Sequence, residues 1–127
     1  MIKRDNVRVC VPRYMQIGKG SLNQLPEILN IIGSVKSPLI VTDKQMVKFG
    51  YVKKLQELLT KAGLTSSVFD ETIPDPTDTV VLNGIDILKK NKNDAVIGFG
   101  GGSPIDTAKA IAVLSQYSKN IQDYKPP

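Results

Sequence analysis

The chain has 127 residues, of which 41% are hydrophobic and 23% are charged, so it is long enough for one domain with a single core and too apolar to be disordered. It contains no histidine and only one cysteine, Cys10, which excludes a Ser-His-Asp or Cys-His nucleophile, a histidine-ligated metal, a zinc cluster and an internal disulfide. The formal net charge is +5, but the lysines and arginines are scattered and aromatic residues do not accompany them, so solvated helix faces explain this charge better than a nucleic-acid interface.

The first predicted elements are two short strands and a helix. Residues 7–11 and 15–17 are short apolar runs that predict the strands of an N-terminal hairpin or lead-in ribbon. After them, apolar residues recur every three or four positions, which is typical of an amphipathic helix, and Gly33 ends the pattern. The residues of this helical stripe are Leu22, Leu25, Ile28, Leu29 and Ile32.

The middle of the chain alternates between strand-like and helix-like patterns. Residues 38–42 are a short apolar run with β-branched side chains between polar turns, which suits a buried strand. Residues 52–62 carry a second helical stripe that Gly63 stops, and Ser67–Phe69 predicts a weaker strand. The second stripe consists of Val52, Leu55, Leu58, Leu59 and Ala62.

The last third of the chain repeats this alternation. A third helix is marked by Val81, Ile85 and Leu88, and Ala95–Gly98 predicts another buried strand. A final helix is predicted to start at Pro104. Its inward face carries Ile105, Ala108, Ile111 and Ala112.

Strands that alternate with helices of about 10–14 residues indicate crossover units in a parallel sheet. We therefore expect an α/β fold, with a Rossmann-like parallel sheet that has helices on both faces and follows a short N-terminal β-hairpin. The chain contains no internal repeat, linker or low-complexity tract, so residues 1–127 are expected to form a single domain. It stops at residues 124–127 without a turn that closes the last unit, which predicts the front portion of a longer protein.

The sequence shows no membrane or secretion signal. No apolar stretch approaches the roughly 20 residues of a membrane span, and residues 1–5 do not lead into the apolar core of a secretory signal. We expect a soluble, cytoplasmic domain that contacts no membrane.

The sharpest feature is the segment from residue 95 to residue 109, in which a buried strand leads into three consecutive glycines (residues 100–102) and then a helix. Glycines let the backbone turn sharply and leave the amides open to an anion. A helix N-terminus adds free N–H groups and a partial positive charge, which suit a phosphate. Ser103 is an N-cap type, Pro104 suits the first helical position, and Asp106 stands at the capping-box position. A capped turn needs only one glycine, so three favour phosphate binding.

This motif is neither a P-loop nor the common dinucleotide fingerprint. A P-loop has a lysine directly after its glycines, and none follows here. The dinucleotide fingerprint places an acidic residue about 20 residues after its glycines. The candidate at that distance, Asp123, is not at a predicted strand end.

Two acidic residues stand where helices are predicted to begin, and one of them also follows a predicted strand directly. Asp43 comes directly after the strand of residues 38–42, where a carboxylate can accept hydrogen bonds from both ribose hydroxyls and repel a 2′-phosphate, which favours NAD over NADP. Alternatively, Asp43 only caps the helix that follows. Asp75 is placed to be an N-cap, with Pro76 and Asp78 at the first and third helical positions, and helix initiation alone explains this pattern.

Together these motifs resemble the N-terminal domain of the iron-containing (group III) alcohol dehydrogenases. The motifs are Val-Thr-Asp-Lys at 41–44, Pro-Asp-Pro-Thr at 74–77 and Gly-Gly-Gly-Ser-Pro-Ile-Asp-Thr-Ala-Lys at 100–109. The lead-in Gly-Lys-Gly-Ser-Leu at 18–22 is also similar, so the resemblance covers essentially the whole chain. Glycerol dehydrogenase and 3-dehydroquinate synthase share a similar glycine turn, but the Ser-Pro-Ile-Asp-Thr-Ala-Lys continuation favours the alcohol dehydrogenases.

The resemblance implies NAD as the cofactor and a role for each matching residue. The backbone amides of Gly101, Gly102 and Ser103 would hold the pyrophosphate. The resemblance also implies that Asp43 contacts the adenosine ribose, that Asp75 lies beside the adenine pocket, and that Asp106 lies near the nicotinamide end.

The resemblance also implies parts that this chain lacks. Proteins of the family carry a Thr-Thr-containing segment that completes the cofactor cleft, and a C-terminal helical domain whose aspartate and histidine side chains bind Fe²⁺ or sometimes Zn²⁺. With that metal polarising the substrate oxygen, the complete enzyme would interconvert a small primary alcohol or diol and its aldehyde by hydride transfer. The present chain supplies no catalytic residue and no metal ligand of that kind, so we expect it to be inactive alone. Because the missing half leaves apolar surface exposed, we also expect a homo-oligomer.

Two alternatives stay open. In the first, the chain is a truncated module that at most binds a nucleotide and has no catalysis; in the second, it is a self-association module whose N-terminal strands pair edge to edge and need no ligand.

Overall fold

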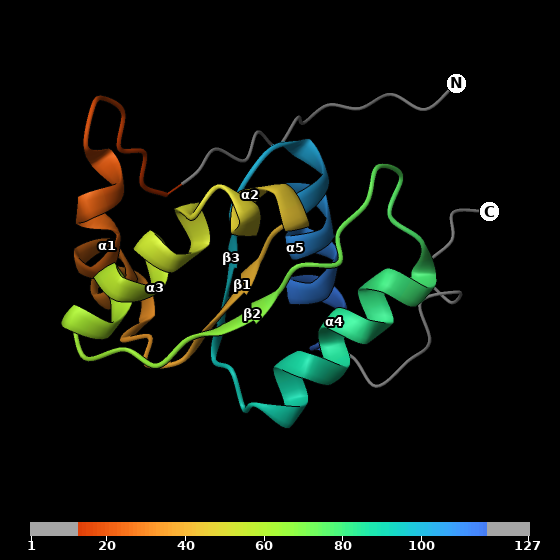
Figure 1. The fold of residues 1–127 in the computed structure, drawn as a ribbon. Helices are drawn as coiled ribbons and strands as arrows, with labels where there is room; N and C mark the ends of the chain where they lie inside the picture. The colour runs from red at the N-terminus through yellow and green to blue at the C-terminus, as the bar shows by residue number, and fades with distance from the viewer. Residues whose placement is uncertain (1–12, 117–127) are drawn as a thin grey trace, which may run out of the picture.

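The computed structural model describes residues 13–116. Its centre is a three-stranded sheet that consists of β1 (Pro38–Val41), β2 (Ser67–Phe69) and β3 (Ala95–Gly98). The strand order is β2-β1-β3, and β1 pairs in parallel with both neighbours. Because all three strands run in the same direction, their carboxyl ends meet at one edge of the sheet, which is uppermost in Figure 1.

Helices cover both faces of this sheet (Figure 1). The helices on one face contribute Leu29, Leu55 and Leu59 to a cluster around Ile40 of β1. The four larger helices are α1 (Leu25–Gly33) and α3 (Tyr51–Lys61) on that face, and α4 (Asp78–Lys90) and α5 (Gly102–Leu114) on the other. Two short helices complete the order, η1 (Ser21–Gln24) before α1 and α2 (Lys44–Lys48) after β1.

The central strand β1 is buried along its whole length. Its side chains alternate between the two faces, as the pleat of a strand requires. Leu39 and Val41 join the cluster formed with α4 and α5, whose core includes Ile85 and Ile111. The strand therefore carries an uninterrupted apolar run because it is covered on both sides, as is typical of parallel sheets.

The structure confirms the predicted α/β architecture, with its parallel strands and the helices between them. It does not show the N-terminal hairpin. The expected strand at 15–17 is wrong, because these residues have no regular secondary structure, and Met15 and Ile17 are 71% and 86% exposed. The other expected strand, residues 7–11, lies outside the described residues.

Polar side chains tie the strands together at the amino edge of the sheet. The carboxylate of Asp94 accepts hydrogen bonds from the backbone N–H groups of Lys36 at 2.8 Å and Ser37 at 2.9 Å. The side-chain amide of Asn93 donates to the Ser37 carbonyl at 3.1 Å and to the Ser67 hydroxyl at 3.2 Å. These contacts link the segments that lead into all three strands, and they support the parallel register.

Candidate functional site

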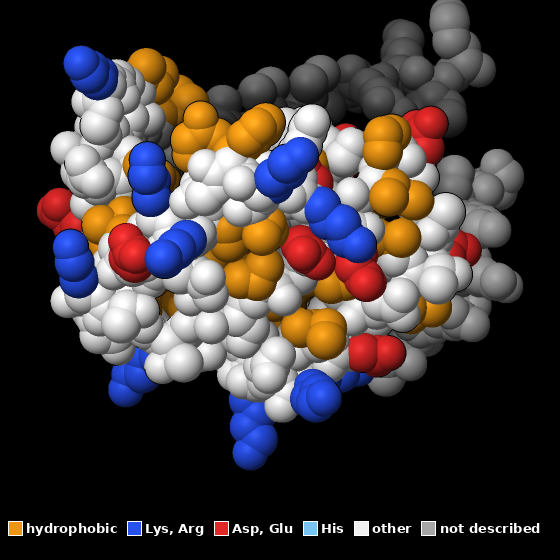
Figure 2. Space-filling model, viewed as in Figure 1, with side chains coloured by type: hydrophobic (Ala, Val, Ile, Leu, Met, Phe, Trp, Pro, Cys, Tyr) orange, Lys and Arg blue, Asp and Glu red, His pale blue; other side chains and the backbone are white. Residues whose placement is uncertain are grey.

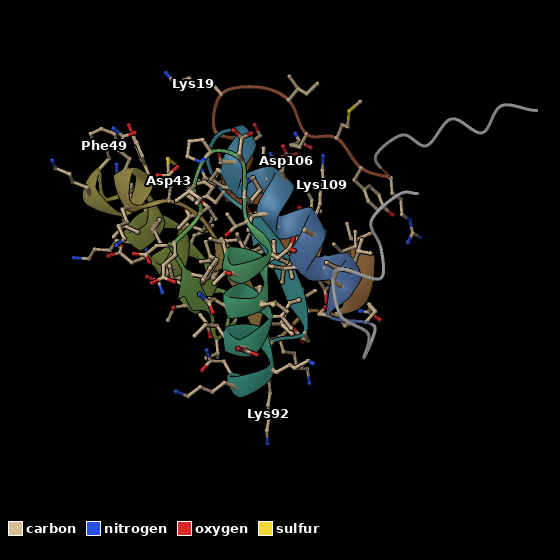
Figure 3. The ribbon with its side chains drawn as sticks, turned by 90° about the vertical axis from the view of Figure 1, so that its right-hand side faces the viewer. Lys19, Asp43, Phe49, Lys92, Asp106 and Lys109 are labelled. Atoms are coloured by element: carbon tan, nitrogen blue, oxygen red, sulfur yellow. The ribbon has the colours of Figure 1, made fainter. Side chains whose placement is uncertain are left out.

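The candidate site lies at the carboxyl edge of the sheet, where the loops that follow the three strands meet. Figure 3 shows Asp43 and Asp106 at this end of the molecule, while Lys92 marks the opposite end. Asp43 follows β1, Asp75 lies in the segment between β2 and α4, and the glycines lie between β3 and α5. Ligands of open α/β sheets bind at this edge.

Helix α5 begins two residues earlier than the capping pattern predicts. Gly101 is the N-cap, its carbonyl accepts a hydrogen bond from the Ile105 N–H at 3.3 Å, and no side chain of the described residues caps this end. The predictions that Ser103 is the N-cap and that Asp106 completes a capping box are therefore wrong. Because Gly101 accepts the first helical bond, Ser103 and Pro104 already lie inside the first turn. The amides of Gly102 and Ser103 consequently point out of an uncapped helix end.

The glycines around this turn fall into two groups. A Cβ on Gly98 would lie 3.0 Å from the Ala108 Cβ, and a Cβ on Gly100 would lie 3.0 Å from the Pro104 Cγ. Gly100 also has a φ of +140°, which side chains disfavour. These two glycines are required by close packing and by backbone conformation.

Gly101 and Gly102 are different, because neither packing nor conformation demands a glycine there. Neither residue has a positive φ, and a Cβ on either would meet no described atom within 4 Å. Their lack of side chains leaves open space above the first amides of a 13-residue helix. Phosphate groups bind at helix ends of this kind, because they need unbonded N–H donors and close approach to the backbone.

Asp43 is a helix cap, which is one of the two roles that the sequence left as alternatives. Its Oδ1 accepts a hydrogen bond from the Met46 N–H at 2.8 Å, so it is the N-cap of α2. Its Oδ2 lies 3.5 Å from the position that a Cβ on Gly100 would take. One carboxylate oxygen therefore caps the helix, while the other lies beside the glycine turn.

Asp75 is not the N-cap of α4, contrary to the capping prediction. The N-cap is Thr77, whose hydroxyl accepts a hydrogen bond from the Val80 N–H at 3.3 Å. An N-cap residue needs extended backbone angles, which Thr77 has, whereas Asp75 has a φ of +52°. Asp75 is exposed in the loop after β2, and its carboxylate is not occupied by helix capping.

Asp106 lies on the exposed side of α5, near the end that carries the glycine turn (Figure 3). Its carboxylate is 4.0 Å from the Lys109 ammonium, and both side chains are about 70% exposed. A solvated pair of this kind contributes little to stability.

Three segments of the site are joined by buried hydroxyls that the sequence patterns did not single out. Thr42 is fully buried, and its hydroxyl donates to the Phe99 carbonyl at 2.7 Å. The hydroxyl of Thr72 donates to the Thr42 carbonyl at 2.8 Å. Thr42 could have been found from the sequence, because it is a hydroxyl residue directly before Asp43, at the end of a buried strand. Nothing in the local sequence marked Thr72.

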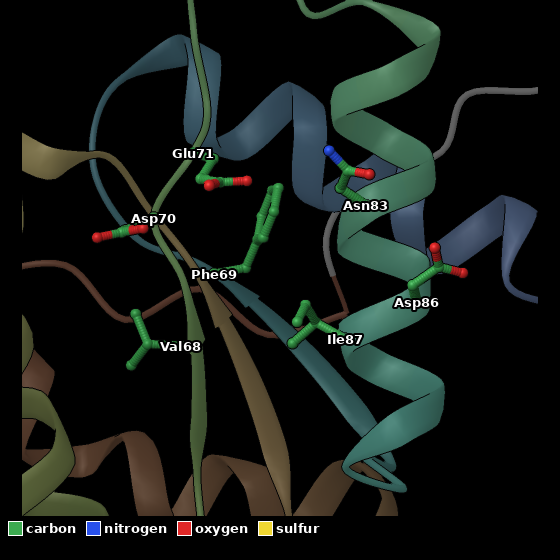
Figure 4. Close-up of a pocket in the computed structure, with 7 residues that line it drawn as sticks. All are labelled: Val68, Phe69, Asp70, Glu71, Asn83, Asp86 and Ile87. Carbon is green, nitrogen blue, oxygen red and sulfur yellow. The ribbon is translucent and has the colours of Figure 1, made fainter.

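A cavity of about 360 Å³ opens between β2 and α4 (Figure 4). It is lined by Val68, Phe69, Asp70, Glu71, Asn83, Asp86 and Ile87. Despite these carboxylates, residues 13–116 contain no group of three or more His, Cys, Asp or Glu side chains placed to hold a metal ion. With no histidine in the chain, the residues present do not fit the iron centre that the resemblance implies for the complete protein.

The surface shows no concentrated basic stripe on the face drawn in Figure 2. Lysine and arginine side chains lie there among acidic and apolar ones. Among the helices of residues 13–116, none combines the length and the apolar character needed to cross a bilayer.

Residues 12–127 match the family model described as iron-containing alcohol dehydrogenase. The chain is 36% identical over 115 residues to an NAD-dependent methanol dehydrogenase of Bacillus methanolicus, a match that covers 91% of this chain and 30% of the relative.

Solved structures agree with this match. An NADH-dependent butanol dehydrogenase of Thermotoga maritima is 28% identical with a TM-score of 0.82, and the match covers 93% of this chain and 30% of that one. A sulfoacetaldehyde reductase of Bifidobacterium kashiwanohense in complex with NAD⁺ is 32% identical with a TM-score of 0.76, covering 84% and 28%. The chain thus spans less than a third of the length of these relatives. Because the family model matches nearly all of its residues, the chain belongs to the iron-containing alcohol dehydrogenase family.

Proposed function

We propose that this chain is the NAD-binding part of a two-domain, metal-dependent alcohol dehydrogenase. The complete enzyme would interconvert a small primary alcohol or diol and its aldehyde by hydride transfer. The observation that carries the proposal is the open helix end at Gly101 and Gly102, where a Cβ would meet no atom of the described residues within 4 Å. The relatives described as NAD- or NADH-dependent, and the one solved with NAD⁺, support this choice of cofactor.

In this proposal, the backbone N–H groups of Gly101, Gly102 and Ser103 donate hydrogen bonds to the pyrophosphate. The helix N-terminus adds partial positive charge at the same point. The Asp43 Oδ2 accepts hydrogen bonds from the adenosine ribose hydroxyls, while its Oδ1 keeps the α2 cap. A 2′-phosphate would bring negative charge against this carboxylate, so NAD is favoured over NADP.

Asp75 and Asp106 are assigned more peripheral positions in the same cleft. Asp75 is free of helix capping and exposed after β2, which suits a place beside the adenine. Asp106 lies on the exposed side of α5 near the turn, which suits the nicotinamide end. Bound NAD supplies the hydride acceptor. Because the chain provides no imidazole, we assign it no metal step, and we propose that residues 1–127 alone bind the cofactor without turnover.

The test is a calorimetric titration of the 127-residue chain with ADP and with NAD⁺. Half of a cofactor cleft should bind with a Kd in the high micromolar to millimolar range, or about −4 to −6 kcal/mol. ADP should bind about as well as NAD⁺, because the residues assigned here contact mainly the adenosine and pyrophosphate. Saturable binding that survives at about 0.15 M salt supports specific contacts, because exposed charges are largely screened there. An absence of heat with both ligands up to about 10 mM would overturn the proposal.

A further inference from the structure

Thr42 connects the three segments of the candidate site through all of its polar groups. Its backbone N–H donates to the Phe69 carbonyl at 2.8 Å. Its carbonyl accepts from the Thr72 hydroxyl at 2.8 Å, and its own hydroxyl donates to the Phe99 carbonyl at 2.7 Å. No other threonine of the described residues makes three such hydrogen bonds, so Thr42 joins the three segments at the carboxyl edge of the sheet.

Thr42 and its partners Thr72 and Phe99 each lie close in sequence to the residues assigned to the cofactor. Asp43 follows Thr42 directly, and Gly100 follows Phe99. Thr72 lies in the loop that carries Asp75. The strand pairing itself ends with Val41 opposite Gly98. Beyond that pair, the Phe99 N–H donates to the Val41 carbonyl at 2.9 Å, and the Thr42 hydroxyl adds a side-chain hydrogen bond between the Asp43 segment and the residue before Gly100.

We propose that the hydroxyls of Thr42 and Thr72 are positioning groups that hold Asp43 at a fixed distance from the glycine turn, so that one nucleotide can engage both at once. This inference rests on the proposed function. It adds how the proposed ribose contact at Asp43 and the proposed phosphate contact at the glycine turn are kept at the right distance from each other. Thr42 is fully buried and Thr72 is 7% exposed, so water competes little for their hydrogen bonds, and such bonds restrict motion effectively.

This positioning role has a specific consequence for binding. ADP must contact the ribose site at Asp43 and the phosphate site at the glycine turn together, whereas inorganic pyrophosphate needs only the turn. Loss of the hydroxyls should therefore weaken ADP by about three- to tenfold, as expected for one or two lost hydrogen bonds, and should leave pyrophosphate almost unchanged. The ratio of the two dissociation constants therefore measures the relative placement of Asp43 and the glycine turn, and not the general stability of the domain.

The experiment titrates the 127-residue chain with ADP and with inorganic pyrophosphate, and measures both Kd values from NMR shifts of the amides at residues 101–103. The variants are Thr42→Val and Thr72→Val, which keep volume and remove the hydroxyl, and Thr42→Ser, which keeps the hydroxyl and removes a methyl group. Thr107→Val is the matched control. Thr107 is as fully buried as Thr42, but its hydroxyl has no hydrogen-bond partner within the described residues.

The proposal expects the ADP-to-pyrophosphate Kd ratio to rise in Thr42→Val and in Thr72→Val, and to stay at the wild-type value in Thr42→Ser and Thr107→Val. Unchanged ratios in both hydroxyl-deleting variants, with normal wild-type binding, would overturn this inference and leave the proposed function intact. An equal rise in Thr107→Val would also overturn it. If the wild-type chain binds neither ligand, the proposed function fails and the inference fails with it. If Thr42→Val does not fold, Thr72→Val and Thr42→Ser decide the matter.

Discussion

Replacing Gly102 by alanine should raise stability while it lowers nucleotide affinity. Gly102 is the first residue of α5, has no positive φ, and a Cβ there would meet no described atom within 4 Å. Alanine is better than glycine in helices by roughly 0.5–1 kcal/mol, partly because it restricts the unfolded chain. For a domain of this size, that gain corresponds to a Tm increase of about 2–4 °C.

The same methyl group should obstruct the ligand. The space that it would fill is the space assigned to a phosphate, which must approach the Gly102 and Ser103 amides to hydrogen-bond distance. Loss of that close approach should weaken ADP binding at least about tenfold, equivalent to about 1.4 kcal/mol. A variant that becomes more stable and binds less well separates a ligand-directed glycine from a structural one.

Gly98 and Gly100 provide matched controls within the same turn. Alanine at Gly98 would place its Cβ 3.0 Å from the Ala108 Cβ and 3.1 Å from the Ile105 Cα, and Gly100 has a φ of +140°. Both substitutions should therefore lower stability, by about 1–3 kcal/mol each. Thermal unfolding by circular dichroism and calorimetric titration with ADP measure the two effects. The reasoning is refuted if Gly102→Ala binds ADP as well as the wild type, or loses as much stability as Gly100→Ala.

Three further predictions concern cofactor choice, the opposite edge of the sheet, and turnover. In the complete two-domain enzyme, Asp43→Gly should improve the use of NADP relative to NAD, because it removes the charge that repels a 2′-phosphate; a ratio of kcat/KM values within about twofold of the wild type would show that Asp43 acts only as a helix cap. Asp94→Ala should lower the free energy of unfolding by about 2 kcal/mol in urea denaturation, since the Lys36 and Ser37 amides lose a charged acceptor, and a change below about 0.5 kcal/mol would contradict this. The 127-residue chain supplied anaerobically with Fe²⁺ or Zn²⁺, NAD⁺ and small alcohols should produce no NADH, because it has no imidazole ligand; absorbance growth that follows the purified protein would contradict this.

The fold could be predicted where the hydrophobic pattern of a segment matches the burial of its side chains in the structure. The apolar run around Ile40 is buried as its pattern predicts. The second helical stripe buries Val52, Leu55 and Leu59, while Leu58 is half-buried and Ala62, at its end, is exposed. The expected strand at 15–17 was wrong because a strand needs a hydrogen-bonded partner as well as apolar residues. Met15 and Ile17 are instead exposed.

The sequence predicted which strands the candidate site residues follow, but it did not predict their local geometry. At residues 74–77 both Asp75 and Thr77 are suitable N-caps, and only the backbone angles decide for Thr77. At α5 a main-chain carbonyl starts the helix, so the side-chain preference of Ser103 did not apply. The link from Thr72 to Thr42 spans 30 residues, and contacts at such a separation leave no local periodicity to detect.

The most direct test of the account is a residue-resolved map of where ADP binds. The isotopically labelled 127-residue chain is titrated with ADP and followed by the amide NMR signals. The account predicts saturable shifts that concentrate at residues 100–103 and 43–46, where the glycine turn and the Asp43 cap lie together at the carboxyl edge. Shifts confined to the cavity between β2 and α4, or no shifts up to about 10 mM ADP, would contradict it.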